Sequence, residues 1–86
     1  MIAYLEGKLR IKSLEGLVVD VGGVGYGVTV SATTLAKLPR QGEPCFLHVH
    51  TNVHERGIDL YGFYSELERR VFRLLTGISG IGPRVA

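Results

Sequence analysis

A glycine-rich segment near the end of the chain has the composition of a phosphate-binding turn. Residues 78–86 read Ile-Ser-Gly-Ile-Gly-Pro-Arg-Val-Ala, and Pro83 suits the first turn of a new helix. Small glycines let backbone amides approach an anion, the N-terminus of that helix favours negative charge, and Arg84 adds a charged donor. The pattern predicts a helix-hairpin-helix turn that binds the DNA backbone without reading sequence. The alternative is an ordinary connection between helices with glycines for packing.

A second group of charges lies at a sharp turn within residues 53–63. A β run ends there in Glu55, Arg56 and Gly57, and a second run returns through Asp59. Gly57 can take the positive φ that a three-residue hairpin loop needs. The sequence therefore predicts a hairpin with a three-residue loop whose tip exposes Glu55 and Arg56.

Nucleotide chemistry is not indicated by the other glycines. Glycines at positions 23, 25 and 27 precede a β run rather than a helix, so they offer no helix N-terminus to a pyrophosphate. A tight hairpin is the favoured interpretation. The chain also has no G-x-x-x-x-G-K-[ST] segment. We therefore expect no ATP hydrolysis, no cofactor and no catalytic residue in this chain.

Three histidines alternate along one predicted strand, as the ligands of a metal ion can. His48, His50 and His54 share a face, Cys45 points to the other face, and no carboxylate is expected beside them. Zinc sites with three or four protein ligands usually have tighter spacing. We therefore expect no metal site and interpret the histidines as the outward face of a strand, of the kind found at a subunit contact.

A basic stripe of Lys8, Arg10 and Lys12 lies on the first predicted strand. Barrels that bind single-stranded nucleic acid add aromatic stacking platforms, mainly around their second and third strands. Those strands offer only Tyr26 here, and we expect this ring in the core. The pattern favours a solvated strand face.

The elements that position these groups have the pattern of a small barrel. Ala3, Leu5, Leu9 and Ile11 alternate with polar residues, which predicts a strand with one buried face. Gly7 on that face allows a bend. Further strands are expected at 17–21, 26–30, 45–54 and 58–61, with a short helix from a cap at Ser31 or Thr33 to Leu38. This is the order of an OB-type Greek-key barrel, with an open five-stranded sheet as the alternative.

A helix is predicted after the barrel. Ser65 and Glu68 can form a capping box, and one apolar face is formed by Leu67, Val71, Leu74 and Leu75. Residues 1–64 hold six basic and six acidic side chains, whereas residues 65–86 hold four basic and two acidic ones. We therefore expect a neutral barrel domain over 1–64 and the start of a basic helical domain over 65–86, which is the more suitable contact for a polyanion.

The composition is that of a small globular protein. Of its 86 residues, 45% are apolar and 21% are charged, and the core of so short a chain is marginal enough for oligomerisation to support it. Cys45 is the only cysteine, which excludes an internal disulfide and fits a reducing cytoplasm. We expect no signal peptide and no membrane span.

Four segments together resemble a known family. They are Met1-Ile2 with Gly7, Gly22-Gly23-Val24-Gly25-Tyr26, Leu60-Tyr61-Gly62-Phe63 and Gly80-Ile81-Gly82-Pro83-Arg84. In this order they are similar to the N-terminal part of the RuvA family, which binds Holliday junctions in a branch-migration complex, and the similarity covers essentially all 86 residues. The resemblance implies an OB-fold domain that forms a homotetramer, or an octamer, followed by paired helix-hairpin-helix motifs.

The resemblance also implies roles for particular residues. Phosphate contacts would come from positions matching Ser79, Gly80, Ile81, Gly82 and Arg84. An acidic pin at the junction centre would lie on the predicted hairpin tip, with its two adjacent acids matching Glu55 and Arg56. Only Glu55 is acidic here, and Asp59 is a candidate for the second negative charge.

The family pattern extends beyond this sequence. A second helix-hairpin-helix motif and a domain that contacts the RuvB motor have no match here, so the resemblance implies an N-terminal fragment. It further implies four-way-junction binding in DNA recombination and repair in the bacterial cytoplasm, with ATP and magnesium used by RuvB. Two alternatives stay open, namely an OB-fold oligomerisation module without DNA binding and a generic single-strand-binding OB domain.

Overall fold

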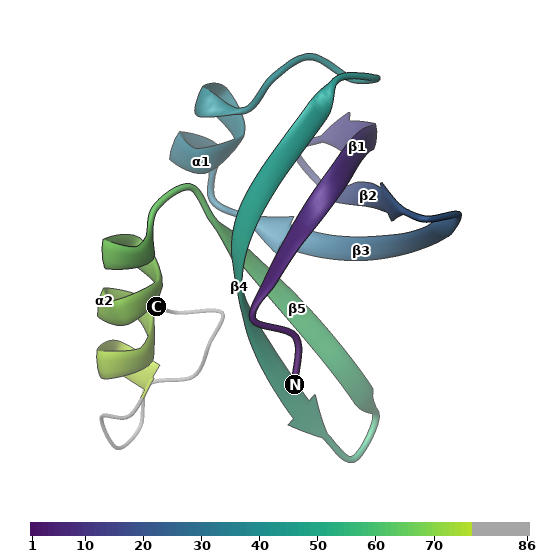
Figure 1. The fold of residues 1–86 in the computed structure, drawn as a ribbon. Helices are drawn as coiled ribbons and strands as arrows, with labels where there is room; N and C mark the ends of the chain where they lie inside the picture. Colours follow the sequence, from purple (N-terminus) through teal and green to yellow (C-terminus); the bar gives the residue numbers. More distant parts are fainter. Residues whose placement is uncertain (77–86) are drawn as a thin grey trace.

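The computed structural model describes residues 1–76, which form a closed β-barrel flanked by two helices (Figure 1). The elements are β1 (Tyr4–Ser13), β2 (Gly16–Val21), β3 (Val24–Val30), α1 (Ala32–Lys37), β4 (Pro44–His54), β5 (Gly57–Phe63) and α2 (Glu66–Thr76). Around the barrel the strand order is β1-β2-β3-β5-β4, and β3 pairs with β5 in parallel. This topology confirms the predicted OB-type barrel and excludes the open sheet.

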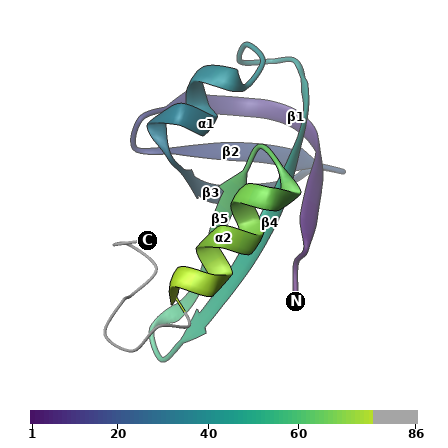
Figure 2. The same cartoon turned by 90° about the vertical axis from the view of Figure 1, so that its left-hand side faces the viewer.

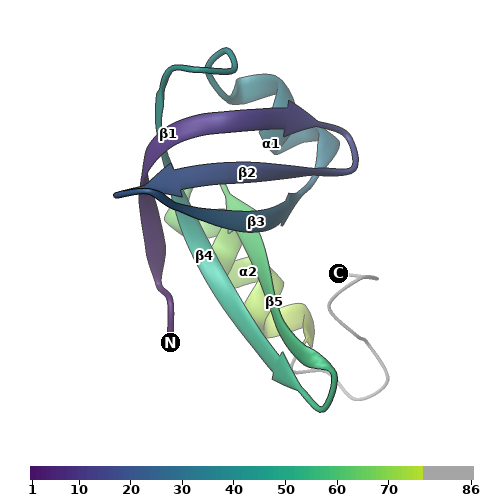
Figure 3. The ribbon, with the colours of Figure 1, turned by 90° about the vertical axis from the view of Figure 1, so that its right-hand side faces the viewer.

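Strand β1 bends because it pairs with two neighbours in succession (Figure 3). Its first half pairs with β4 and its second half with β2. Gly7 lies at this change, where a Cβ atom would collide with the carbonyl oxygen of Asp20. A side chain here would therefore force the strands apart, which explains the glycine that the sequence places on the core face.

A β-bulge between Leu9 and Ile11 corrects the predicted alternation of β1. Leu9 is fully buried opposite Val19, but Ile11 pairs with Val18 and is exposed. The prediction that Ile11 lies on the core face was wrong, because the extra residue of a bulge reverses the alternation that follows it.

The core fills the barrel interior and is closed at one end by α1. Its buried side chains are mainly aliphatic: Leu5, Leu9, Leu17, Val19, Val28, Leu38, Cys45, Leu47, Val49 and Leu60. Ser31 caps α1, since its Oγ accepts a hydrogen bond from the Thr34 amide at 3.1 Å. Tyr26, which was expected in the core, is partly buried and packs against it.

Helix α2 lies against the outer surface of β4 and β5 (Figure 2). Phe72 is its only buried side chain, and the ring contacts Tyr61 and Phe63 at centroid distances of 5.4 and 4.9 Å. Leu67 and Leu74 of the predicted apolar face are 68% and 72% exposed. The helix therefore docks through a different side from the one that the apolar spacing identifies. No helix within residues 1–76 is long and apolar enough to cross a membrane.

Candidate functional site

The β4–β5 hairpin projects past the rest of the barrel and ends in a charged tip (Figures 1 and 3). Strand pairing continues to His54 and Gly57, so the loop contains two residues, Glu55 and Arg56. The expected three-residue loop was wrong, because Gly57 already pairs as the first residue of β5. Gly57 does adopt the predicted positive φ, at +140°, which a side chain would strain.

The tip residues Glu55 and Arg56 carry opposite charges, and they differ in the hydrogen bonds that they make. Both are exposed, and no hydrogen bond or ion pair within residues 1–76 engages the Glu55 carboxylate. The backbone amide of Arg56 donates to Nδ1 of His54 at 3.2 Å. The predicted pin position is therefore presented to solvent by a paired stem. The role of Glu55 and Arg56 at a junction stays a prediction.

Asp59 does not share the end of the hairpin with Glu55. Its Oδ2 lies 2.9 Å from Nε2 of His54, across the stem. Asp59 is two residues beyond Gly57, the cross-strand partner of His54, so the side chains of His54 and Asp59 are diagonal neighbours on one face. The Asp59 carboxylate, the candidate for a second negative charge, thus lies within the stem and pairs with His54.

The three histidines of β4 have separate environments. His48 Nδ1 lies 3.2 Å from Glu66 Oε2, and His54 pairs with Asp59. The expectation that no carboxylate lies beside the histidines was therefore wrong for two of them. These groups do not converge, and no cluster of three potential metal ligands occurs among the described residues.

His50 lies beneath α2, with its ring centroid 5.3 Å from that of Phe72. Burial lowers the pKa of His50, and the nearby charges of Arg73 and Arg69 lower it further. Its Nδ1 is buried without a hydrogen-bond partner within the described part of the chain. The outward face of β4 is therefore covered here by α2 of the same chain, rather than free for a subunit contact.

Arg69 fastens α2 to the barrel, a role that the sequence pattern did not reveal. Its guanidinium donates to the carbonyl oxygen of Ala3 at 2.9 Å and to Glu66 Oε1 at 2.7 Å, and its side chain is 13% exposed. The hydrogen bond from Arg69 lowers the pKa of Glu66. A basic residue in a helix normally indicates a solvated face, so only the position of the Ala3 carbonyl could have identified this contact.

The start of α2 is also tied to α1. Ser65 Oγ accepts a hydrogen bond from the Glu68 amide at 3.2 Å and donates to the Glu68 carboxylate at 3.3 Å. The same carboxylate accepts a hydrogen bond from Thr34 Oγ1 at 3.3 Å. The cap at Ser65 is as predicted, but Glu68 reaches the Ser65 hydroxyl and α1 instead of the Ser65 amide. The predicted phosphate-binding residues Ser79, Gly80, Ile81, Gly82 and Arg84 lie outside the described residues.

The basic stripe on β1 is interrupted by the bulge. Lys8 and Arg10 are exposed at least in part, whereas Lys12 turns to the barrel end and donates to the Leu38 carbonyl at 3.1 Å. An exposed aromatic pair, Tyr4 and Phe46, stacks with ring centroids 5.4 Å apart. Sequence reasoning missed this pair, because its members lie on strands that only the fold brings together.

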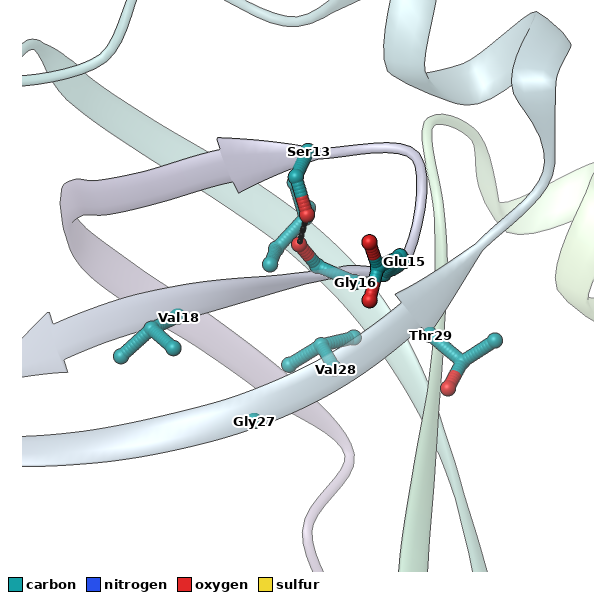
Figure 4. Close-up of a pocket in the computed structure, with 8 residues that line it drawn as sticks. Ser13, Glu15, Gly16, Val18, Gly27, Val28 and Thr29 are labelled. Carbon is teal, nitrogen blue, oxygen red and sulfur yellow. Dashed lines mark hydrogen bonds between the residues drawn. The ribbon is translucent and has the colours of Figure 1, made fainter.

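A hollow beside the β1–β2 turn has no catalytic chemistry. It is lined by Ser13, Glu15, Gly16, Leu17, Val18, Gly27, Val28 and Thr29 (Figure 4). Glu15 is its only ionisable residue, and Ser13 Oγ donates to the Gly16 carbonyl at 2.9 Å. The hydroxyl thus stabilises the turn, and no histidine or lysine lines the hollow to activate it.

Comparison with known proteins places this fold in a family. A sequence model described as RuvA N terminal domain matches residues 1–62. The chain belongs to the RuvA family. A RuvA of Geobacter sp. (strain M21) is 48% identical over all 86 residues, which are 43% of its length, and one of Anaeromyxobacter sp. (strain Fw109-5) is 52% identical over the same 86 residues, which are 44% of its length. Both are named Holliday junction branch migration complex subunit RuvA. The chain thus spans less than half the length of these relatives.

Proposed function

We propose that this chain is the N-terminal part of a non-catalytic subunit that binds four-way DNA junctions during branch migration. The name of its RuvA relatives supports this function. The observation that carries the proposal is the exposed Glu55–Arg56 tip at the end of a hairpin that projects from a closed barrel. Such a tip can enter the centre of a junction, where the DNA arms separate.

Charge explains what the tip would do there. The exposed Glu55 carboxylate repels backbone phosphates and so favours separation of strands at the crossover. The effect is local, because charges are screened over about 8 Å at physiological ionic strength. Arg56 attracts the same phosphates, so each tip combines repulsion with attraction.

Assembly and movement require further parts. A homotetramer would bring four tips to the crossover, and an octamer of two such rings would bring four from each ring, with Ser79, Gly80, Ile81, Gly82 and Arg84 binding phosphates around it. The work of moving the branch point would come from a RuvB-type ATPase that uses ATP and magnesium and binds outside these 86 residues. In this scheme the chain itself carries no cofactor.

A chimaera tests the proposal directly. Residues 1–86 replace the matching segment of the Geobacter sp. (strain M21) relative, of which they cover 43%. Gel-shift titrations then compare a four-way junction with linear duplex of the same sequence and length. We expect tighter binding to the junction, and equal affinity for both would refute the proposal. Light scattering on the 86-residue chain separately measures whether it assembles.

A further inference from the structure

The imidazole of His54 makes two contacts that together define the form of its ring. Nδ1 accepts a hydrogen bond from the Arg56 amide at 3.2 Å, and Nε2 lies 2.9 Å from Asp59 Oδ2. A nitrogen that accepts a hydrogen bond carries no proton, so Nδ1 is bare. The proton of the neutral ring is therefore on Nε2, where it is donated to the Asp59 carboxylate.

The two contacts of the His54 ring connect the Glu55–Arg56 loop to the strands of the hairpin stem. Gly57, the cross-strand partner of His54, has no side chain to pair with. The ring of His54 instead spans to Asp59 along β5 and to the backbone of Arg56 in the loop. The amide of Arg56 has no other hydrogen-bond acceptor among residues 1–76. The side chain of His54 thus adds a hydrogen bond within the loop to the strand pairing that closes it.

We propose that His54 is a positioning residue that holds the Glu55–Arg56 tip and makes junction binding sensitive to protons. A proton that binds Nδ1 removes the acceptor of the hydrogen bond from the Arg56 amide, and the ring becomes an imidazolium beside Asp59. The charged residues next to His54 are Glu55 and Arg56 along the chain and Asp59, whose carboxylate pairs with the ring. With a neutral ring they leave one net negative charge on each tip, and with a charged ring they leave none. This coupling rests on the junction binding proposed above.

The first part of the test needs no DNA. In the 86-residue chain at pH 8, the 15N shifts of the His54 ring should show protonation at Nε2. On acid titration the Arg56 amide resonance should move together with the His54 ring. In His54→Gln that titrating shift should disappear. A ring protonated at Nδ1 at pH 8, or an Arg56 amide that does not follow His54, would overturn the proposal.

The second part measures junction affinity in the chimaera between pH 8 and pH 6. Loss of one net negative charge per tip should tighten binding by about two- to fivefold for each tip that contacts the junction, the range for a single exposed charge interaction. His54→Gln should remove this tightening. The matched control is His48→Gln, which removes a histidine from the same face of β4 that pairs with Glu66 instead of the tip, and should leave the pH dependence intact.

The two proposals fail in different ways. An unaltered chimaera that binds no junction at any pH contradicts the proposed function, while the ring and amide shifts still decide whether His54 holds the tip. If the chimaera binds junctions and His54→Gln keeps the full pH dependence, the proton coupling is overturned and junction binding stands.

Discussion

Replacement of Phe72 by alanine should undock α2 and leave the barrel folded. Phe72 is 6% exposed and packs on Tyr61, Phe63 and His50 from outside the barrel. Loss of a buried phenylalanine ring costs about 3–5 kcal/mol. We take the lower limit, about 3 kcal/mol, because the site lies at the outer surface of the barrel. An isolated helix as short as α2 is marginal in water, so it should lose its structure when this contact is removed.

Native-state hydrogen exchange measures this effect residue by residue. A loss of about 3 kcal/mol should lower the protection of α2 amides by about a hundredfold, since each 1.4 kcal/mol is a factor of ten. The amides of Leu9, Val19 and Leu47 should keep their protection, because these residues lie in the barrel core.

The matched control is Leu74→Ala in the same helix. Leu74 is 72% exposed, so its truncation should change the free energy of unfolding by less than about 0.5 kcal/mol. The reasoning would be refuted by an equal loss of protection in barrel and helix, or by a larger effect at Leu74 than at Phe72.

Two further predictions concern the tip and pH. In the chimaera, Glu55→Gln should strengthen junction binding slightly at low salt by removing repulsion, whereas Arg56→Asp should weaken it; gel-shift titrations that show the opposite signs would exclude a repulsive pin. Because burial lowers the pKa of His50 in the folded chain below its ordinary value of 6.5, the unfolded chain binds more protons in acid, and stability should fall as pH drops below about 6.5. Urea denaturation should show a smaller fall in His50→Phe, which keeps a ring against Phe72 but cannot titrate.

The barrel was predictable from sequence because its strands obey a local rule. Apolar alternation, β-branched runs and glycines at turns placed all five strands along the chain, and the short helix between the third and fourth strands indicated the OB-type barrel. The bulge after Leu9 left no trace in that alternation. The bulge closely follows Lys8, where β1 changes from one neighbouring strand to the other, and no property of residues 9–11 reveals this change. Both Ile11 and Lys12 were therefore assigned to the wrong face.

The docking face of α2 could not be read from periodicity. The helix has two apolar surfaces, one with Leu67, Val71 and Leu74 and one with Phe72, and the larger one is the more exposed. The barrel decides between them, because Tyr61 and Phe63 form an aromatic surface that accepts one ring. Because the helix docks on the side that carries Phe72, Arg69 also lies at the interface, and its guanidinium donates to the carbonyl oxygen of Val49 on β4.

The contacts of Phe72 and Arg69 connect the two regions that the sequence indicated for DNA binding, the hairpin tip and the segment after α2. The tip at Glu55 is one end of the paired β4–β5 hairpin, and α2 is fastened to the outside of these same strands by Phe72 and Arg69. The last described residue, Thr76, therefore has a fixed position relative to the tip. A phosphate-binding segment that begins just beyond it would start at a set distance from the junction centre. Under the proposed function the barrel would align the tip with that segment, and Phe72 would contribute to this alignment by holding α2 against β5.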